Sequence, residues 1–148
     1  MRIRGLLVVL YLSIMSIYCE SQKNIVIIGH RGAKGHLAEN TLPSIAKAID
    51  LGVNGIEIDV FKCASGELVV FHDKTLEDLT NASGYIEDLD LDSIQRIEVL
   101  DGYTIPTLNE VMDLIQGKVF LNIELKGSQT AIETNNLLEE YFDKEEWS

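Results

Sequence analysis

The sequence has little positive charge and very little cysteine, and each shortage excludes a class of protein. Only 12 Lys and Arg accompany 24 Asp and Glu, which gives a formal net charge of −12. Nucleic acids and anionic membrane surfaces are bound through basic patches, so neither is an expected partner. With 2 Cys and 2 Pro in 148 residues, the chain also lacks the composition of a disulfide scaffold or a fibrous protein.

A hydrophobic run long enough to cross a membrane is missing too. The apolar stretch of residues 6–18 is shorter than the roughly 20 residues that a spanning helix needs. Because Arg2 and Arg4 precede it and polar residues follow, the pattern predicts a signal peptide over residues 1–21. The protein is therefore expected to be exported, to the periplasm or the medium.

The two cysteines are expected to have separate fates. Lipid attachment at Cys19 is an alternative to cleavage after Ser21, although Tyr18 is a poor match for the small residue that precedes such sites. A lipoprotein would be held at the membrane only through that lipid. Either way Cys63 is the one cysteine left in the mature chain, so no internal disulfide can form, and we expect it to be a small apolar filler.

The rest of the chain, residues 24–148, alternates between strand and helix patterns and is expected to form one domain. Short runs rich in β-branched residues predict buried strands at residues 24–29, 55–61, 68–72 and 119–125. Helices are predicted from Asn40 to Gly52 and over residues 108–115 and 128–142, and a polar stretch fills residues 75–103. This alternation predicts an α/β fold with a parallel sheet.

One connection does not fit the alternation. Only 13 positions separate Asp59 from His72, which is too short for a strand, a helix and a second strand. About seven extended residues could return along a short strand and make a parallel pair. A hairpin is the alternative, and a tight one is expected to place His72 at the opposite end of the sheet from Asp59.

Charged residues interrupt the strands at one end, where their burial would be costly unless they are paired or bind a metal. Glu57 and Asp59 share a face of the second strand, and Glu124 and Lys126 share a face at the end of the fourth. The remaining members follow the first and third strands: His30, Arg31 and His72. Each has a structural interpretation by itself, but polar residues at the ends of four successive strands are typical of a (β/α) barrel site.

The residue types suggest distinct roles in a reaction at phosphorus. Three carboxylates and no thiolate form a hard-oxygen set that suits Mg²⁺ or Ca²⁺. Arg31 and Lys126 can hold phosphate oxygens. His30 and His72 titrate near neutral pH, as general acid–base groups must. His36, between Gly35 and Leu37, is expected to be peripheral.

Several blocks together resemble the glycerophosphodiester phosphodiesterase family, over residues 25 to 130. They occur in order and at the family's spacing: His30-Arg31-Gly32, Glu39-Asn40-Thr41, Gly55-Ile56-Glu57-Ile58-Asp59-Val60, Gly66-Glu67-Leu68-Val69-Val70-Phe71-His72-Asp73, Ile105-Pro106-Thr107-Leu108-Asn109-Glu110 and Ile123-Glu124-Leu125-Lys126.

The resemblance implies a TIM-type (β/α)₈ barrel that hydrolyses glycerophosphodiesters to glycerol 3-phosphate and an alcohol with a divalent cation, Ca²⁺ or Mg²⁺. It implies metal ligation by Glu57, Asp59 and Glu124, and acid–base catalysis by His30 and His72. Arg31 and Lys126 would bind the substrate phosphate, and Glu39 would support the site. The polar stretch at 75–103 falls where the family carries an inserted segment. Parallel strands become the preferred choice for the short connection, since the family needs Asp59 and His72 at one end.

The length departs from the family, because a full barrel takes about 250 residues. The chain is expected to hold the first half, with about four parallel strands and an open edge through which it could self-associate. Two alternatives remain: a phospholipase D-like enzyme of the same superfamily, and an inactive, truncated remnant.

Overall fold

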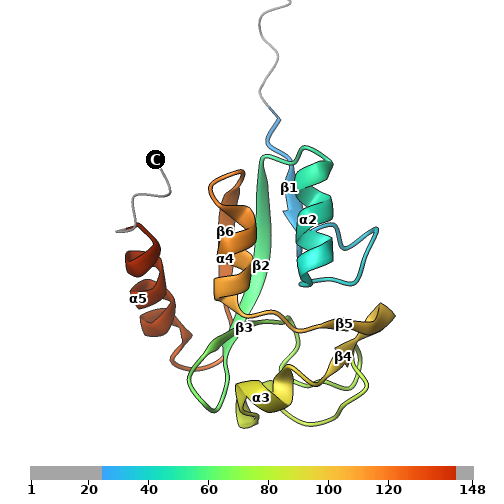
Figure 1. Cartoon of the computed structure of the whole chain (residues 1–148), viewed down its shortest axis with the longest axis vertical. Helices are drawn as coiled ribbons and strands as arrows, with labels where there is room; N and C mark the ends of the chain where they lie inside the picture. The colour runs from blue at the N-terminus through green and yellow to red at the C-terminus, as the bar shows by residue number, and fades with distance from the viewer. Residues whose placement is uncertain (1–24, 143–148) are drawn as a thin grey trace, which may run out of the picture.

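The strand β2 (Gly55–Lys62) is the centre of the sheet, and its alternating side chains divide the molecule into two faces. Ile56, Ile58 and Val60 are fully buried in the main hydrophobic cluster. Glu57 and Asp59, one residue out of step, therefore point to the opposite face. The computed structural model describes residues 25–142. Figure 1 shows β2 in the middle of this part of the chain.

Parallel strands flank β2 on both sides. β1 (Ile28–His30) pairs with Gly55–Glu57, and β6 (Phe120–Leu125) pairs with Gly55–Val60. The C-terminal ends of all three strands lie at the same end of the sheet. Figure 1 places there the segment that contains α3 (Leu91–Ile94), β4 (Glu98–Val99) and β5 (Tyr103–Thr104). The predicted parallel sheet of an α/β barrel is confirmed in these three strands.

The fourth strand of the sheet runs the other way. β3 (Leu68–Val70) pairs antiparallel with the last three residues of β2, with Val60 opposite Val70 and Lys62 opposite Leu68. The preference for a parallel pair is thus wrong, because a tight turn in which Cys63 N donates to Glu67 O leaves no room for a return along β2. The expectation that a hairpin would separate His72 from Asp59 is wrong as well.

The register explains why the hairpin keeps these residues together. Val60 has Leu125 on one side and Val70 on the other, so β3 lies on the same side of β2 as β1 but beyond the end of β1. Phe71 N then donates to Asp59 O at 3.0 Å. His72, the next residue, arrives at the edge where β1 ends.

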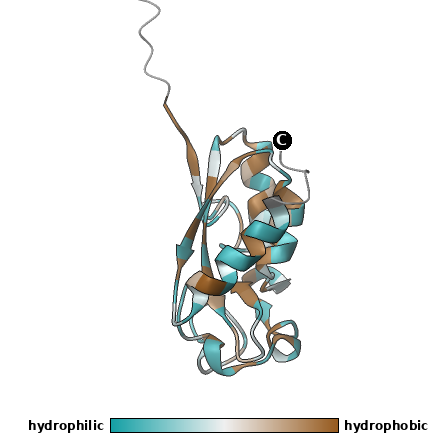
Figure 2. Cartoon of the chain, turned by 90° about the vertical axis from the view of Figure 1, so that its left-hand side faces the viewer, coloured by the Kyte–Doolittle hydropathy of each residue, from teal (hydrophilic) through white to brown (hydrophobic). Residues whose placement is uncertain are grey.

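Helices cover one face of the sheet, as Figure 2 shows from the side. α2 (Leu42–Asp50) and α4 (Leu108–Ile115) contribute Ile45, Ala48 and the apolar side of α4 to the main cluster. Thr41 and Thr107 cap the two helices, and Glu110 completes a capping box with Thr107. Both helices agree with the patterns in the sequence.

The third helix, α5 (Thr130–Phe142), packs less deeply. Leu137, Leu138 and Tyr141 lie against the main cluster, whereas Ile132, which the spacing assigns to the same side, is 67% exposed. No helix among residues 25–142 is long and apolar enough to cross a membrane. The predicted signal peptide and Cys19 lie outside the described residues and stay predictions.

A second hydrophobic cluster joins the inserted segment to the β2–β3 hairpin, on the face opposite the main cluster. The segment also contains the short 3₁₀ turns η1 (Ile86–Asp88) and η2 (Leu100–Gly102). Its buried Ile86 and Ile94 pack with Phe61 and Phe71 of the hairpin. Cys63 is a free thiol in this cluster with 3% exposure, which agrees with the role of apolar filler. Polar in sequence, the insert still has a core of its own.

Gly32, in the loop between β1 and α2, is predicted to tolerate no side chain. Its φ is +80°, and an added Cβ would lie 2.8 Å from Ser44 C and 2.9 Å from Ile45 N, both backbone atoms of α2. Left-handed strain of about 1–2 kcal/mol adds to overpacking of about 1–3 kcal/mol. We expect Gly32→Ala to lower the free energy of unfolding in urea by about 2–5 kcal/mol. Gly35→Ala, which meets nothing within 4 Å, is the control, and equal losses in both variants would contradict the account.

Candidate functional site

Three carboxylates from two neighbouring strands converge on the face of the sheet opposite the main hydrophobic cluster. β2 supplies Glu57 and Asp59, and the register places Glu124 of β6 directly beside Asp59. One oxygen from each of the three lies within 4.8 Å of the others. Carboxylate oxygens at this spacing can hold a hard divalent cation such as Mg²⁺ or Ca²⁺. The structure thus brings together the three residues that were predicted as a set, and their role as metal ligands stays a prediction.

The environment of Asp59 fits such a cation. The residue is fully buried, and its Oδ2 is engaged by Asn40 Nδ2 at 2.9 Å and by Arg31 Nε at 3.3 Å. Its Oδ1 accepts no hydrogen bond in the described structure, although Lys126 Nζ lies 3.3 Å away. A buried acceptor without a hydrogen bond is costly. A cation on Oδ1 would satisfy it.

Arg31 is placed by its backbone as well as by its side chain. Its φ is +54°, and its N–H donates to Glu57 Oε2 at 3.0 Å. The guanidinium lies between two carboxylates, with Nη1 2.6 Å from Glu39 Oε1 and Nε 3.3 Å from Asp59 Oδ2. A positive charge held in this way stands at the edge of the carboxylate cluster, where an anion could meet it.

Lys126 bridges the two strands that carry the carboxylates. Its Nζ lies 2.7 Å from Glu124 Oε1 and 3.3 Å from Asp59 Oδ1. The hydrogen bond that it donates lowers the pKa of Glu124, and the same bond raises the pKa of Lys126. Both groups are thus held charged at neutral pH, in a place where a metal ion and a phosphate would compete for them.

The two predicted histidines, His30 and His72, lie at the end of the sheet where β1 and β2 finish. His30 Nε2 is 3.8 Å from Glu57 Oε2, and its side chain is 63% exposed. His72 Nδ1 lies 2.6 Å from Asp73 Oδ1. Because Asp73 engages Nδ1, Nε2 is the nitrogen of His72 left for proton exchange. His30 is exposed and His72 is half-buried, so both rings are accessible to a substrate beside the carboxylate cluster.

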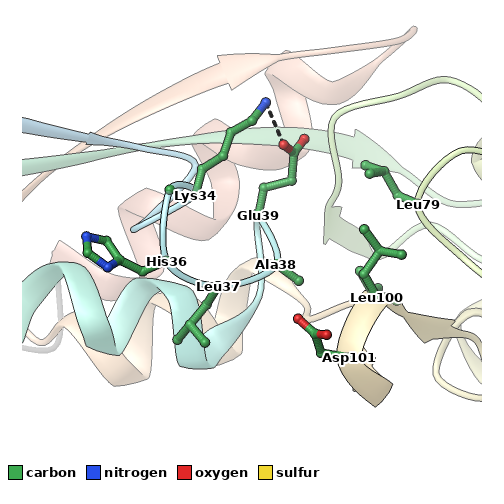
Figure 3. Close-up of a pocket in the computed structure, with 10 residues that line it drawn as sticks. Lys34, His36, Leu37, Ala38, Glu39, Leu79, Leu100 and Asp101 are labelled. Carbon is green, nitrogen blue, oxygen red and sulfur yellow. Dashed lines mark ion pairs between the residues drawn. The ribbon is translucent and has the colours of Figure 1, made fainter.

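Glu39 ties the loop between β1 and α2 to the site. Its two oxygens bind Arg31 Nη1 and Lys34 Nζ, each at 2.6 Å. Burial would raise the pKa of Glu39, but the hydrogen bonds from Lys34 and Arg31 outweigh it, and the pKa lies below its ordinary value. Figure 3 shows the Lys34–Glu39 pair beside a hollow of about 300 Å³ that Leu79 and Leu100 of the insert also line.

Sequence reasoning missed three partners of the site. Asn40 was predicted only as the start of a helix, yet Thr41 is the cap of that helix and Asn40 contacts Asp59. Lys34 and Asp73 contact Glu39 and His72 but lie in loops without a periodic signal. Both Asn40 and Asp73 belong to the blocks that carry the family resemblance, which was the available signal. His36 is exposed and makes none of these contacts.

Comparisons with known proteins point to one family. The pattern of the glycerophosphoryl diester phosphodiesterase family matches residues 30–146. A glycerophosphodiester phosphodiesterase from Caldanaerobacter subterraneus subsp. tengcongensis is 41% identical over 110 residues, which cover 69% of this chain and 45% of that protein.

Solved structures agree with the sequence relatives. A glycerophosphodiester phosphodiesterase from Thermotoga maritima has a TM-score of 0.72 and 33% identity, over 80% of this chain and 52% of that one. An Oleispira antarctica phosphodiesterase in complex with the product sn-glycerol-3-phosphate has a TM-score of 0.71 and 31% identity, over 84% and 53%. The chain thus spans about half the length of the relatives that it matches.

The ion pairs of Glu39 should make stability depend on pH. Since its folded pKa lies below the ordinary 4.5, its contribution is present above pH 4.5 and is lost as pH falls through the folded pKa. We expect Glu39→Gln to lower the free energy of unfolding by about 1–3 kcal/mol at pH 7. The gap to the wild type should close below pH 4.5, as urea titrations from pH 3 to 7 would measure. The exposed Glu98→Gln is the control; a gap for Glu39→Gln that stays constant with pH would refute the assignment.

Proposed function

The chain belongs to the glycerophosphoryl diester phosphodiesterase family. We therefore propose that it carries the catalytic and metal-binding residues of an enzyme that hydrolyses glycerophosphodiesters. The products would be glycerol 3-phosphate and an alcohol. The observation that carries this proposal is the carboxylate set Glu57, Asp59 and Glu124, in which Oδ1 of Asp59 is buried and accepts no hydrogen bond. Since the chain spans about half the length of its relatives, the activity is proposed for the protein to which this half-barrel belongs.

The three carboxylates would hold a divalent cation, Ca²⁺ or Mg²⁺. When bound, such an ion offsets the charge that develops on the phosphoryl oxygens. The residues beside it would bind the substrate anion: Arg31 through its planar guanidinium and Lys126 as a point charge. Both already stand against the carboxylates at 2.7–3.3 Å, so they would also keep the anion close to the cluster.

His30 and His72 would move the protons of the reaction. One ring nitrogen takes the proton of the attacking water as its oxygen bonds to phosphorus. The other ring gives a proton to the alcohol oxygen as the P–O bond breaks, so the alcohol leaves neutral. The contact between His72 and Asp73 (2.6 Å) orients that ring for such an exchange.

Charge balance supports this assignment. Apart from the His72–Asp73 pair, four carboxylates (Glu39, Glu57, Asp59, Glu124) are accompanied by three permanent cations (Arg31, Lys34, Lys126). A divalent cation would turn the single excess negative charge into a single positive one. That value matches a phosphodiester, which carries one negative charge.

The location of the enzyme is also a proposal. The basic and apolar pattern of residues 1–21 supports export, and glycerophosphodiesters outside the cell would then be the substrates. Lipid attachment at Cys19 would keep the protein at a membrane surface. An alkaline phosphatase fusion to residues 1–24 would be active only if the segment directs export.

Histidine variants and a chelator test the reaction. Purified protein is incubated with glycerophosphocholine and CaCl₂ or MgCl₂, and glycerol 3-phosphate is assayed. His30→Ala and His72→Ala should each lower kcat about 10²–10⁴-fold because each removes one proton transfer, and EDTA should abolish turnover. His36→Ala, an exposed ring outside the cluster, should leave the rate unchanged.

A binding assay covers the case in which the half-barrel does not turn over substrate. A metal ion that binds the folded chain should raise its melting temperature. At a metal concentration a hundred times Kd, binding adds about 2.7 kcal/mol to the free energy of unfolding. No shift with either metal, or turnover that survives EDTA, would refute the proposed cation. Cleavage of sphingomyelin in preference to glycerophosphocholine would instead favour a phospholipase D-like activity.

A further inference from the structure

Asn40 binds the Asp59 carboxylate and backbone together. Its Nδ2 donates to Asp59 Oδ2 at 2.9 Å, and its Oδ1 accepts from Asp59 N at 3.4 Å. Asn40 is 1% exposed and Asp59 is fully buried, so water does not weaken either contact. The contact with the backbone N–H orients the amide, and the oriented amide holds one oxygen of the carboxylate in place.

The amide suits this task because it carries no charge. A Lys or Arg at position 40 would neutralise Asp59 and weaken its attraction for a cation. An amide adds no further positive charge to that of Arg31 and Lys126, which already flank Asp59, and it contacts Oδ2. The other oxygen, Oδ1, accepts no hydrogen bond and lies 3.3 Å from Lys126 Nζ, beside the carboxylates of Glu57 and Glu124.

The backbone of Asn40 connects this contact to the arginine of the site. Its φ is +58°, a conformation that Asn and Gly adopt most readily. Its N–H donates to Arg31 O at 3.0 Å, which closes the loop between β1 and α2. The same residue therefore holds Arg31, through its backbone, and Asp59, through its side chain.

We propose that Asn40 is a positioning residue whose amide turns the Asp59 carboxylate so that Oδ1 faces the cation. This inference rests on the proposed function, because it requires that Glu57, Asp59 and Glu124 bind a metal. Hydrogen bonds to metal-binding side chains typically change metal affinity about 10–100-fold. Asn40 acts through Asp59 and does not itself touch the metal or the substrate.

Two substitutions separate the amide from the backbone. Asn40→Gly removes the amide and keeps the left-handed conformation, whereas Asn40→Ala removes the amide and adds backbone strain. If the amide positions Asp59, both variants should bind Ca²⁺ about 10–100-fold more weakly in calorimetric titrations with CaCl₂ alone. The alanine variant should also melt at a lower temperature than the glycine variant. Titrations are run well below both melting temperatures.

Bound Tb³⁺ adds a readout that a merely structural role would not move. A carboxylate that has turned away is replaced on the ion by water, which shortens the luminescence lifetime of Tb³⁺. We expect a shorter lifetime in Asn40→Gly than in the wild type. Asn54→Ala is the control, since Asn54 Oδ1 makes a similar bond to Ile27 N (2.8 Å) at the other end of the sheet; it should change neither Kd nor lifetime.

The outcomes distinguish this inference from the function on which it rests. A wild type that binds neither Ca²⁺ nor Tb³⁺ overturns both. A wild type that binds, with folded Asn40 variants of unchanged Kd and lifetime, overturns the positioning role and leaves the metal site standing. Weaker binding with the lifetime of the wild type also overturns it, because the ion would then keep all its protein oxygens.

Discussion

The burial of a charged carboxylate in the central strand is the constraint on which this structure depends. Asp59 is completely inaccessible, and such a charge is destabilising by several kcal/mol unless neighbouring groups compensate for it. The compensation comes from three groups: Asn40 and Arg31 in the loop after β1, and Lys126 at the end of β6. This loop and the end of β6 are thereby fixed to one side chain of β2, which is why the predicted site residues converge.

Most of the fold could be predicted because its signals are local. The caps and apolar spacing of α2 and α4 act within one helix, and the strand pattern of β2 follows from burial on both faces. β6 was predicted to be buried as well, but its residues are exposed or half-buried. The orientation of β3 could not be predicted in this way. Strand direction depends on where β2 ends, and β2 continues to Lys62 before the turn. Three residue pairs, rather than a full-length return, bring His72 back to Asp59.

The candidate site was predictable where charged residues interrupt apolar strands, and less so in loops. Glu57, Asp59 and Glu124 stand out because each interrupts an apolar run in the sequence. In the structure Glu57 and Asp59 are buried, whereas the side chain of Glu124 is 55% exposed. Asn40 gave no such signal, since a polar residue before a helix is most simply explained as a cap. Its actual role depends on a left-handed backbone and on a contact 19 positions away, neither of which follows from local pattern.

The face of the sheet that carries Asp59 has apolar residues at the start of its strands and polar site residues at the end. At the start of the strands it carries Ile28, Gly55 and Phe120, and the ring of Phe120 lies over Gly55 where a Cβ would overlap it. Ile28 and Phe120 are each 47% exposed, so the residues that the structure describes cover this apolar part of the face only partly. At the other end the same face carries His30, Glu57, Asp59 and Glu124, and Arg31 and Lys126 form ion pairs with two of these carboxylates. Contacts within this half can therefore preorganise the polar end, whereas the apolar part of the face would need further strands to bury it. The part of the barrel that would bind the cation is in this respect more self-sufficient than the part that would close it.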